Sequence, residues 1–337
     1  MINRQVTLLS HPNGIPVKEN FGMIETQAPT PGEGQFLVRN LYFSLEAAIR
    51  GWLDGRESYF PPIPLGGVVR GPTVGEIIQS NHPDYQVGDI VWGLNHWEEY
   101  SLVDENTILL KKLEVRPGVP RSYYIGALGG SGQTAYVGLH KIGNIQAGET
   151  VVVSAAAGAT GSIAVQVAKM RGCKVIGIVG SADKARLVVD ELGADGVVNY
   201  RETPDVAAAV RELCPEGVNI YYDNVGGTTL DGMLTCMTDF GRVIGCGMIS
   251  DYNHQDKPTP IYNMWKLVEK QLTLRGFLLH HHIDAIPAAM DALHEWIGEG
   301  KVKVLENVTK GIENTGEAYS NMMKGATIGK NLVELTF

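Results

Sequence analysis

Cysteine is scarce in this chain, and its first 172 residues contain none. The four cysteines, Cys173, Cys214, Cys236 and Cys246, are far apart. No pair has the spacing of about two to four residues that is typical of a structural zinc site. Three consecutive histidines at residues 280–282 do not suggest a metal site either, because adjacent side chains of a regular element point in different directions. We therefore expect buried free thiols and no bound metal.

Long apolar runs and an excess of positive charge are also absent from the sequence. No apolar stretch is long enough to span a bilayer, and no apolar segment follows a basic start at the N-terminus. The formal net charge of −9 argues against nucleic acid or an anionic membrane as the main partner. We expect a cytoplasmic globular protein, and its 337 residues favour two domains over one.

A short apolar run that leads into a turn of very small residues organises the rest of the chain. Residues 150–154 are mostly β-branched, residues 155–162 are Ala, Gly, Thr and Ser, and apolar positions then recur at helical spacing. This pattern predicts a strand, a tight turn and a helix. Such a turn presents backbone N–H groups at a helix N-terminus, where the helix dipole also favours a phosphate.

The turn has the spacing of a dinucleotide-binding fingerprint. It reads Ala155-x-x-Gly158-x-x-Gly161, with alanine where the fingerprint has its first glycine. Gly158 would allow the backbone to approach a pyrophosphate, and Gly161 would allow the helix to pack closely on the strand. Small residues also serve ordinary helix–strand packing, but a second apolar run at residues 174–180 completes a βαβ unit and favours the functional interpretation.

The end of this second run carries no acidic residue. An NAD site usually has Asp or Glu there, which binds the hydroxyl groups of the adenosine ribose. Here Gly180-Ser181-Ala182 takes that place, and Lys184 follows. A lone helix lysine is often only solvated, but where no carboxylate competes it can pair with a 2′-phosphate. The sequence therefore predicts NADPH rather than NADH as the cofactor.

The distribution of glycine, proline and apolar runs divides the chain into parts. Residues 1–125 have short runs between Gly- and Pro-rich turns, which predicts a β-barrel or sandwich. Residues 126–300 alternate strand and helix patterns, which predicts an α/β fold with a doubly wound parallel sheet. Residues 301–337 return to short strands with one helix, and we expect them to rejoin the first domain.

The alternation in residues 126–300 also locates the end of the sheet that would bind a ligand. After the first two strands we expect strands at 196–200, 218–227, 241–247 and 272–277, and helices at 182–192, 206–214, 229–237 and 261–269. Ligands of such sheets bind beyond the carboxyl ends of the strands. Asn224, Cys246 and the residues after Gly247 therefore fall on the ligand side.

Three motifs resemble one family of reductases. They are Ala155-Ala156-Ala157-Gly158-Ala159-Thr160-Gly161-Ser162, Tyr221-Tyr222-Asp223-Asn224-Val225-Gly226-Gly227 and Gly245-Cys246-Gly247-Met248-Ile249-Ser250-Asp251-Tyr252-Asn253. They are similar to the zinc-free medium-chain dehydrogenases/reductases. Within that group the resemblance is to the leukotriene B4 12-hydroxydehydrogenase/prostaglandin reductases, the plant alkenal double-bond reductases and bacterial curcumin reductase. It covers nearly the whole chain.

The resemblance implies a fold and an activity. The fold would be a Rossmann doubly wound sheet inserted in a β-rich GroES-like domain, with residues 274–277 extending the sheet between the subunits of a homodimer. The activity would be the NADPH-dependent reduction of the C=C bond of small α,β-unsaturated aldehydes and ketones (enones and enals).

The resemblance also implies the site residues. Lys184 and Tyr200 would hold the 2′-phosphate, with Ser181 nearby. Asn224 and Cys246 would line the ribose–nicotinamide half of the cofactor. Thr134 would lie at its nicotinamide end, and Tyr252 matches a tyrosine that the family places beside the substrate carbonyl. The full set of expected cofactor-binding residues is Thr134, Ala157, Gly158, Ala159, Thr160, Gly161, Gly180, Ser181, Lys184, Tyr200, Asn224, Cys246, Ser250, Tyr252 and Thr327.

Two positions depart from the family pattern, and both fall in the expected site. Where the family commonly has Asp-Pro-Tyr-Met-Arg, this chain has Glu46-Ala47-Ala48-Ile49-Arg50, so that Ala48 replaces a tyrosine of the pocket. Thr327 takes the place of an asparagine that usually contacts the cofactor. The expected substrate pocket consists of Ala48, Trp52, Tyr59 and Tyr252, although aromatic side chains more often pack in a core.

Zinc-dependent alcohol oxidation, which occurs in the same superfamily, is excluded by the sequence. It needs a catalytic cysteine and a Gly-His-Glu motif, whereas this chain has no cysteine before Cys173 and reads Leu65-Gly66-Gly67-Val68 at the matching position. Without a metal, hydrogen bonds must polarise the substrate carbonyl. We expect hydride to pass from the nicotinamide to the β-carbon of an enone, with the resulting enolate stabilised by the Tyr252 hydroxyl and the cofactor ribose.

Two other functions remain open at this point. One is an NADPH-dependent quinone oxidoreductase of the same superfamily. The other is an NADPH-binding protein with a sensory or structural role and negligible turnover. Faster reduction of a naphthoquinone than of any alkenal would favour the first, and tight NADPH binding without consumption would favour the second.

Overall fold

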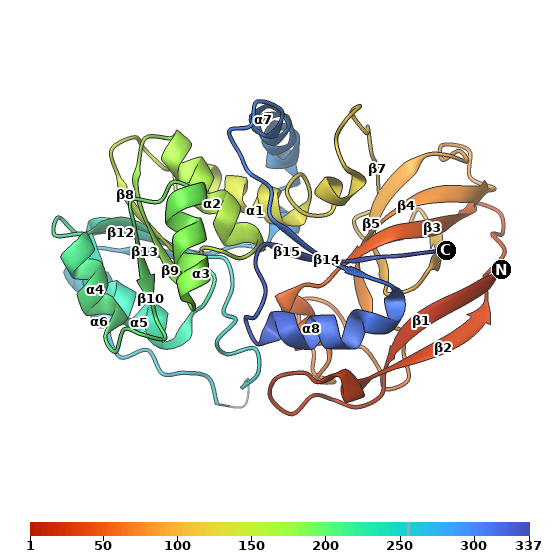
Figure 1. Cartoon of the computed structure of the whole chain (residues 1–337), viewed down its shortest axis with the longest axis horizontal. Helices are drawn as coiled ribbons and strands as arrows, with labels where there is room; N and C mark the ends of the chain where they lie inside the picture. Colours follow the sequence, from red (N-terminus) through yellow and green to blue (C-terminus); the bar gives the residue numbers. More distant parts are fainter. Residues whose placement is uncertain (255–256) are drawn as a thin grey trace. The chain divides into compact units, whose positions relative to one another are not determined.

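The protein consists of two compact units, and the computed structural model describes residues 1–254 and 257–337. The terminal unit contains Met1–Gly126 and Glu306–Phe337, and the inserted unit contains Ala127–Leu305. Figure 1 shows both. Because the inserted unit is one continuous segment, the chain leaves the terminal unit once and returns to it once.

A mostly antiparallel sheet forms the frame of the terminal unit. Its strands lie in the order β14-β15-β3-β4-β5-β7, and β6 also pairs with β3. Their bounds are β3 (Gln35–Ser44), β4 (Arg70–Ser80), β5 (Ile90–His96), β6 (Tyr100–Asp104), β7 (Lys111–Lys112), β14 (Glu306–Lys310) and β15 (Lys330–Glu334). β14 and β15 are parallel, and the other pairs in this sheet are antiparallel. β1 (Ile2–Leu8) and β2 (Phe21–Gln27) form a separate antiparallel pair.

Bulges and one glycine allow β3 and β4 to pack closely. The register shifts between Leu37 and Val38 and again between Asn40 and Tyr42, and such bulges bend a strand and increase its twist. Gly75 lies opposite this stretch, and a Cβ there would come within 2.4 Å of the Val38 Cγ1 atom. Glycine therefore fits this position where a larger residue would push the strands apart.

Aromatic side chains fill the core of the terminal unit. Trp97 is fully buried, and its ring centroid lies 5.8 Å from that of Phe43 and 5.4 Å from that of Tyr319. The Trp97 indole N–H donates to the Ser44 carbonyl oxygen at 3.2 Å. Tyr319 belongs to α8 (Thr315–Met323), so the C-terminal segment completes this core. Short helices join the strands: η1 (Lys18–Asn20), η2 (Ala47–Trp52), η3 (Arg121–Tyr124) and η8 (Ile312–Asn314).

The inserted unit is a parallel sheet in the doubly wound order. Its strands lie in the order β10-β9-β8-β11-β12-β13, and all pairs are parallel. Their bounds are β8 (Thr150–Ser154), β9 (Lys174–Val179), β10 (Gly196–Asn199), β11 (Val218–Asp223), β12 (Met237–Gly245) and β13 (Thr273–Gly276). The order reverses between β8 and β11, which is the point at which such sheets bind ligands. The predicted Rossmann sheet is confirmed.

Helices pack on this sheet in two groups. The helices are α1 (Gly130–Val137), η4 (Gly138–Ile142), α2 (Ala159–Met170), α3 (Ala182–Arg186), η5 (Leu187–Glu191), α4 (Val206–Leu213), α5 (Gly227–Cys236), α6 (Trp265–Glu269), η6 (Leu279–His281), η7 (Ile283–Ala285) and α7 (Ile286–Gly298). α1 contacts α2 and α7, whereas α5 contacts α4 and α6. The second group covers an apolar cluster that includes Val152, Tyr221 and Met233. In the described part of the chain, no helix has the length and apolar character needed to cross a membrane.

The helix expected over residues 261–269 begins only at Trp265. Asn263 explains the later start. Its N–H donates to Asp231 Oδ1 at 2.7 Å, and its side-chain amide donates to Asp231 Oδ2 at 2.9 Å. These bonds hold the residues before α6 against α5, where they cannot form a helical turn. β12 also begins earlier than residue 241, at Met237.

Candidate cofactor site and active site

The turn after β8 brings a helix N-terminus next to the end of a strand. Ala155 has a positive φ of 48°, which costs a residue other than glycine about 1 kcal/mol and explains the glycine of the usual fingerprint. The Gly158 N–H donates to the Ala155 carbonyl oxygen at 2.9 Å, and Gly158 is the N-cap of α2. A Cβ on Gly161 would lie 2.2 Å from the Ala155 oxygen. Glycine therefore allows α2 to pack directly on the turn.

The other residues expected at this turn differ in exposure. Ala157 is buried behind it and is 2% exposed, whereas Ala159 and Thr160 are half-buried in the first turn of α2. The backbone N–H groups of a first helical turn have no acceptor within the helix. Partly exposed and at the positive end of the α2 dipole, they can bind a pyrophosphate.

Hydrogen bonds join the ends of β8 and β11 across the switch point. The Asn224 side-chain amide donates to the Ser154 carbonyl oxygen at 2.7 Å, and the Asn224 N–H donates to Ser154 Oγ at 2.9 Å. Ser154 Oγ donates in turn to the Asp223 carboxylate at 3.2 Å. The side chain of Asn224 is thus oriented by the strand that leads into the Ala155–Gly161 turn.

Asp223 organises this end of the sheet, and the sequence analysis did not single it out. Its Oδ1 accepts from the Tyr221 hydroxyl at 2.7 Å and from the N–H groups of Val225 and Gly226 at 2.9 Å each. Burial raises the pKa of Asp223, and these donors oppose the rise. An aspartate directly after an apolar strand and before an Asn-Val-Gly-Gly turn was the available signal, but the sequence does not show that the carboxylate turns inward.

Tyr222 interacts with Thr134 and affects the pKa of Cys246, two residues that the resemblance assigns to the site. Its hydroxyl donates to the Thr134 carbonyl oxygen at 2.9 Å, and it lowers the pKa of the Cys246 thiol. Burial has the larger effect and raises the pKa of that thiol to about 12, so Cys246 stays protonated and is a poor nucleophile at neutral pH. Gly138 makes room for the ring, because a Cβ there would lie 2.6 Å from Tyr222 Cε2.

The loop after β12 holds Tyr252 at the same end of the sheet. Ser250 donates its N–H and its Oγ to the Val225 carbonyl oxygen at 3.1 and 2.7 Å. The Met248 N–H donates to Tyr252 Oη at 3.3 Å. Burial raises the pKa of Tyr252, and the bond from Met248 opposes the rise. The phenol is therefore neutral at physiological pH and retains its own proton for a hydrogen bond to another group.

The residues expected around the 2′-phosphate lie at the ends of β9 and β10. The Tyr200 N–H donates to the Val179 carbonyl oxygen at 2.9 Å. The Tyr200 ring covers Gly180, because a Cβ there would lie 2.6 Å from Tyr200 Oη. Ser181 caps α3 by accepting from the Lys184 N–H at 3.3 Å. Burial lowers the pKa of Lys184, and so does the positive charge of Arg201.

The expected pocket residues of the terminal unit differ in exposure. Ala48 is half-buried in η2. Trp52, at the end of η2, is 3% exposed and belongs to the core cluster around Trp97. Tyr59 is 46% exposed, and its ring centroid lies 6.0 Å from that of Trp52 in an edge-to-face arrangement.

An ion pair joins the two segments that depart from the family pattern. Lys330 Nζ donates to Glu46 Oε1 at 2.5 Å, and Ser44 Oγ donates to the same oxygen at 2.9 Å. Lys330 is 3% exposed. Glu46 lies two residues before Ala48, and Lys330 lies three residues after Thr327. The segments that carry the two departures are therefore held together within the terminal unit.

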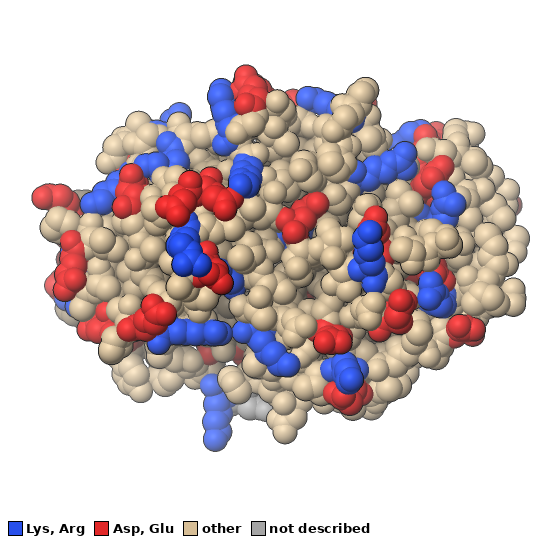
Figure 2. Space-filling model, in the orientation of Figure 1, with Lys and Arg blue, Asp and Glu red and all other residues tan. Residues whose placement is uncertain are grey.

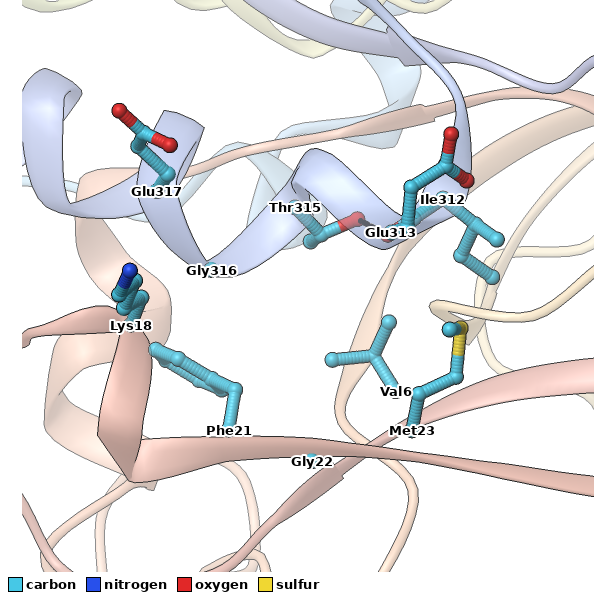
Figure 3. Close-up of a pocket in the computed structure, with 10 residues that line it drawn as sticks. All are labelled: Val6, Lys18, Phe21, Gly22, Met23, Ile312, Glu313, Thr315, Gly316 and Glu317. Atoms are coloured by element: carbon cyan, nitrogen blue, oxygen red, sulfur yellow. Dashed lines mark hydrogen bonds between the residues drawn. The ribbon is translucent and has the colours of Figure 1, made fainter.

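A hollow of about 300 Å³ also lies in the terminal unit. Figure 3 shows it between β1–β2, which contribute Val6, Phe21 and Met23, and the first turn of α8, with Lys18 and Glu317 at one end. The remaining lining residues are Gly22, Ile312, Glu313, Thr315 and Gly316. None of the residues predicted for the cofactor or the substrate lines this hollow.

Comparison with known proteins identifies the family. The model described as "N-terminal domain of oxidoreductase" matches residues 4–110, and the model described as "Zinc-binding dehydrogenase" matches residues 159–295. The chain is 37% identical to the NADPH-dependent curcumin reductase of Escherichia coli (strain K12), over 99% of this chain and 97% of that one. It is also 37% identical to a 2-alkenal reductase (NADP(+)-dependent) of Nicotiana tabacum, over 98% of this chain and 97% of the relative.

Solved structures give the same result. CurA from Vibrio vulnificus in complex with NADPH matches with a TM-score of 0.92 and 34% identity, over 99% of each chain. The protein is thus an oxidoreductase with NADPH as its cofactor. It belongs to the medium-chain dehydrogenase/reductase family, in the zinc-free branch of the prostaglandin reductases, alkenal double-bond reductases and bacterial curcumin reductases.

Proposed function

We propose that this protein reduces the carbon–carbon double bond of α,β-unsaturated aldehydes and ketones. The proposal is carried by the neutral phenol of Tyr252, which is held at the same end of the sheet as Asn224 and Cys246. A hydrogen-bond donor in that place suits a reaction in which negative charge develops on a carbonyl oxygen. The relatives named as a curcumin reductase and a 2-alkenal reductase support this substrate class.

The residues expected to bind the cofactor lie mostly in the inserted unit. The inserted unit would bind NADPH, because it contains the glycine turn, the switch point and Lys184. Ala48, Trp52, Tyr59 and Thr327 belong to the terminal unit, and the roles expected for them at the substrate and the cofactor stay predictions. We propose the division that the sequence indicates, with residues 1–125 and 301–337 as the substrate domain and residues 126–300 as the NADPH-binding domain.

The residues of the inserted unit fit the cofactor. At Gly161 a Cβ would overlap the Ala155 carbonyl oxygen, and the close packing that glycine permits keeps the α2 N-terminus at the turn. We propose that Gly158–Gly161 hold the pyrophosphate and that Gly180, Ser181, Lys184 and Tyr200 hold the adenosine 2′-phosphate. Thr134, Asn224, Cys246 and Ser250 would line the nicotinamide half. When bound, NADPH supplies the hydride.

Tyr252 would act on the substrate's oxygen. Its hydroxyl donates a hydrogen bond to the carbonyl oxygen, which stabilises the negative charge that develops there as the β-carbon accepts hydride and the double bond becomes an enolate. A proton from solvent then adds to the α-carbon, and the saturated carbonyl compound leaves. This route needs a neutral donor at the carbonyl, and the raised pKa of Tyr252 keeps the phenol in that form.

A small substrate panel tests the proposal. Consumption of NADPH, followed by its absorbance, would be measured with an alkyl enal, an aryl enone such as a chalcone, a naphthoquinone and a saturated ketone, with NADH in parallel. We expect consumption with the enal and the enone, a saturated-carbonyl product by mass spectrometry, and no reaction with the saturated ketone. Consumption with the naphthoquinone alone would make the protein a quinone oxidoreductase. NADPH binding without any consumption would contradict an enzymatic role.

A further inference from the structure

Arg201 lies near the residues expected to bind the 2′-phosphate, which are Lys184, Tyr200 and Ser181. The sequence did not indicate Arg201 as one of them. Arg201 follows β10, which pairs in parallel with β9 so that Asn199 lies opposite Val179. Parallel strands end at the same edge of a sheet, so Arg201 and the Gly180-Ser181 turn share that edge. Burial lowers the pKa of Lys184, and the positive charge of Arg201 lowers it further.

Asn199 holds the backbone of Arg201, and the Tyr200 ring lies beside its side chain. The Arg201 N–H donates to Asn199 Oδ1 at 3.2 Å. The guanidinium carbon lies 5.9 Å from the centroid of the Tyr200 ring, a cation–π distance. The same ring covers Gly180, the residue at which an NAD enzyme would carry its acidic side chain. The guanidinium is thereby tied to the ring that covers the end of β9.

Two cations beside a bound phosphate both attract it. α3 also carries Arg186, which is paired with Asp183. A phosphate monoester carries close to two negative charges at neutral pH. A guanidinium can also give two parallel hydrogen bonds to its oxygens, which an ammonium cannot.

We propose that Arg201 is the second cation of the 2′-phosphate site and a determinant of the preference for NADPH over NADH. The inference rests on the proposed cofactor site but not on the proposed substrate. Lys184 supplies a partly buried point charge, and Arg201 supplies an exposed planar donor held over Tyr200. NADH carries an uncharged hydroxyl group in place of the 2′-phosphate, so neither cation would gain a charge pair with it.

Binding measured without substrate tests the proposal. Dissociation constants would be determined by calorimetry for NADPH, NADH and 2′,5′-ADP with the wild type and Arg201→Gln. We expect Arg201→Gln to weaken the binding of NADPH and of 2′,5′-ADP by about tenfold, which is the usual effect of losing a hydrogen bond between charged groups. The dissociation constant for NADH should stay unchanged. The affinity for NADPH should also fall less steeply with added salt in the variant.

Two further variants complete the design. Arg186→Gln removes a nearby arginine that is already paired and should change none of the three constants. Arg201→Lys keeps the charge without the planar fork and should recover part of the loss. An equal loss of NADPH and NADH affinity in Arg201→Gln would show that Arg201 only supports the local fold. Unchanged dissociation constants for both cofactors would also overturn the proposal. If no enone or enal were reduced, the proposed substrate would be wrong, but the binding results would still test the role of Arg201, because they are measured without substrate.

Discussion

A tyrosine hydroxyl stabilises an enolate only while it keeps its proton, and the surroundings of Tyr252 favour the protonated form. Burial raises the pKa of this phenol, whereas the Met248 N–H favours the phenolate. The net shift is upward, so the protonated form persists beyond the ordinary phenol value of about 10. Cys246, at the same end of the sheet, is also kept neutral. The chemistry we propose therefore depends on neutral hydrogen-bond donors.

Tyr252→Phe removes the donor and keeps the ring. We expect kcat for enone reduction to fall by about 100-fold, the usual cost of losing one oxyanion donor, with the dissociation constant for NADPH changed less than about twofold. The wild type should show no loss of activity from ionisation of this group below a pH of about 10. Steady-state kinetics across pH and an NADPH titration measure both effects.

Tyr262→Phe is the matched control, because Tyr262 is 80% exposed. This substitution should leave kcat and the dissociation constant for NADPH unchanged. If kcat of Tyr252→Phe equals that of the wild type, Tyr252 has no part in the reaction.

Single residues also show where sequence reasoning ends. The turn that contains Gly158 and Gly161 could be predicted, because the fingerprint relates residue type to spacing, whereas the roles given to these residues and to Lys184 stay predictions. Asp223 and Arg201 could not be predicted, since their importance depends on neighbours that are distant in the sequence. Asp223 accepts hydrogen bonds from Ser154 and Tyr221, and the role we propose for Arg201 depends on β10 lying beside β9.

At the scale of elements, the strongest sequence signal was the strand–turn–helix of β8 and α2. β-branched residues and then small ones leave few other structures for this stretch, and β8 and α2 lie where the pattern placed them. The helix at residues 261–269 was harder to delimit, because its start depends on a hydrogen bond from Asn263 to the distant Asp231. Side-chain hydrogen bonds of this kind leave no periodic trace in a sequence.

The two glycines of this turn should respond differently to alanine. In Gly161→Ala the Cβ would overlap the Ala155 carbonyl oxygen, so α2 must shift. We expect a loss of about 1–3 kcal/mol in the free energy of unfolding together with weaker NADPH binding. In Gly158→Ala the Cβ meets the same oxygen at 3.1 Å and φ is −84°. The fold should therefore survive, while NADPH binding should fall because the added methyl group would crowd the pyrophosphate in the site we propose.

Urea unfolding without cofactor and NADPH titration separate the two effects. Gly298→Ala, at the end of α7 where a Cβ meets nothing within 4 Å, should alter neither quantity appreciably. Equal losses of stability in Gly158→Ala and Gly161→Ala would contradict these separate roles.

At the scale of the whole molecule, the mixture of charges matches a small-molecule partner. On the face drawn in Figure 2, Lys and Arg side chains are interspersed with Asp and Glu, without an extended area of one sign. That face offers no continuous track for a polyanion. The net charge of −9 leads to the same expectation.

The edge of the parallel sheet offers a test of the assembly. β13 ends the strand order of the inserted unit, and Leu274 on it is 42% exposed. We propose that β13 pairs with its counterpart in a second copy of this chain, as open sheet edges do. The wild type should then sediment as a dimer at micromolar concentration, and Leu274→Lys should shift it toward the monomer.

Val308→Lys is the matched control for the assembly. Val308 is 41% exposed on β14, which ends the strand order of the sheet in the terminal unit, and its replacement should leave the dimer intact. A wild-type protein that sediments as a monomer would refute the proposed assembly.

The Lys330–Glu46 pair has a consequence for how this protein diverges from its relatives. Because a single carboxylate oxygen accepts from both Lys330 and Ser44, we expect a shift of the backbone near Ala48 to be felt in the segment of Thr327. Substitutions of Ala48 and Thr327 should then be non-additive. The effect of Ala48→Tyr should differ between a background with Thr327 and one with Thr327→Asn, and equal effects in the two backgrounds would contradict this coupling.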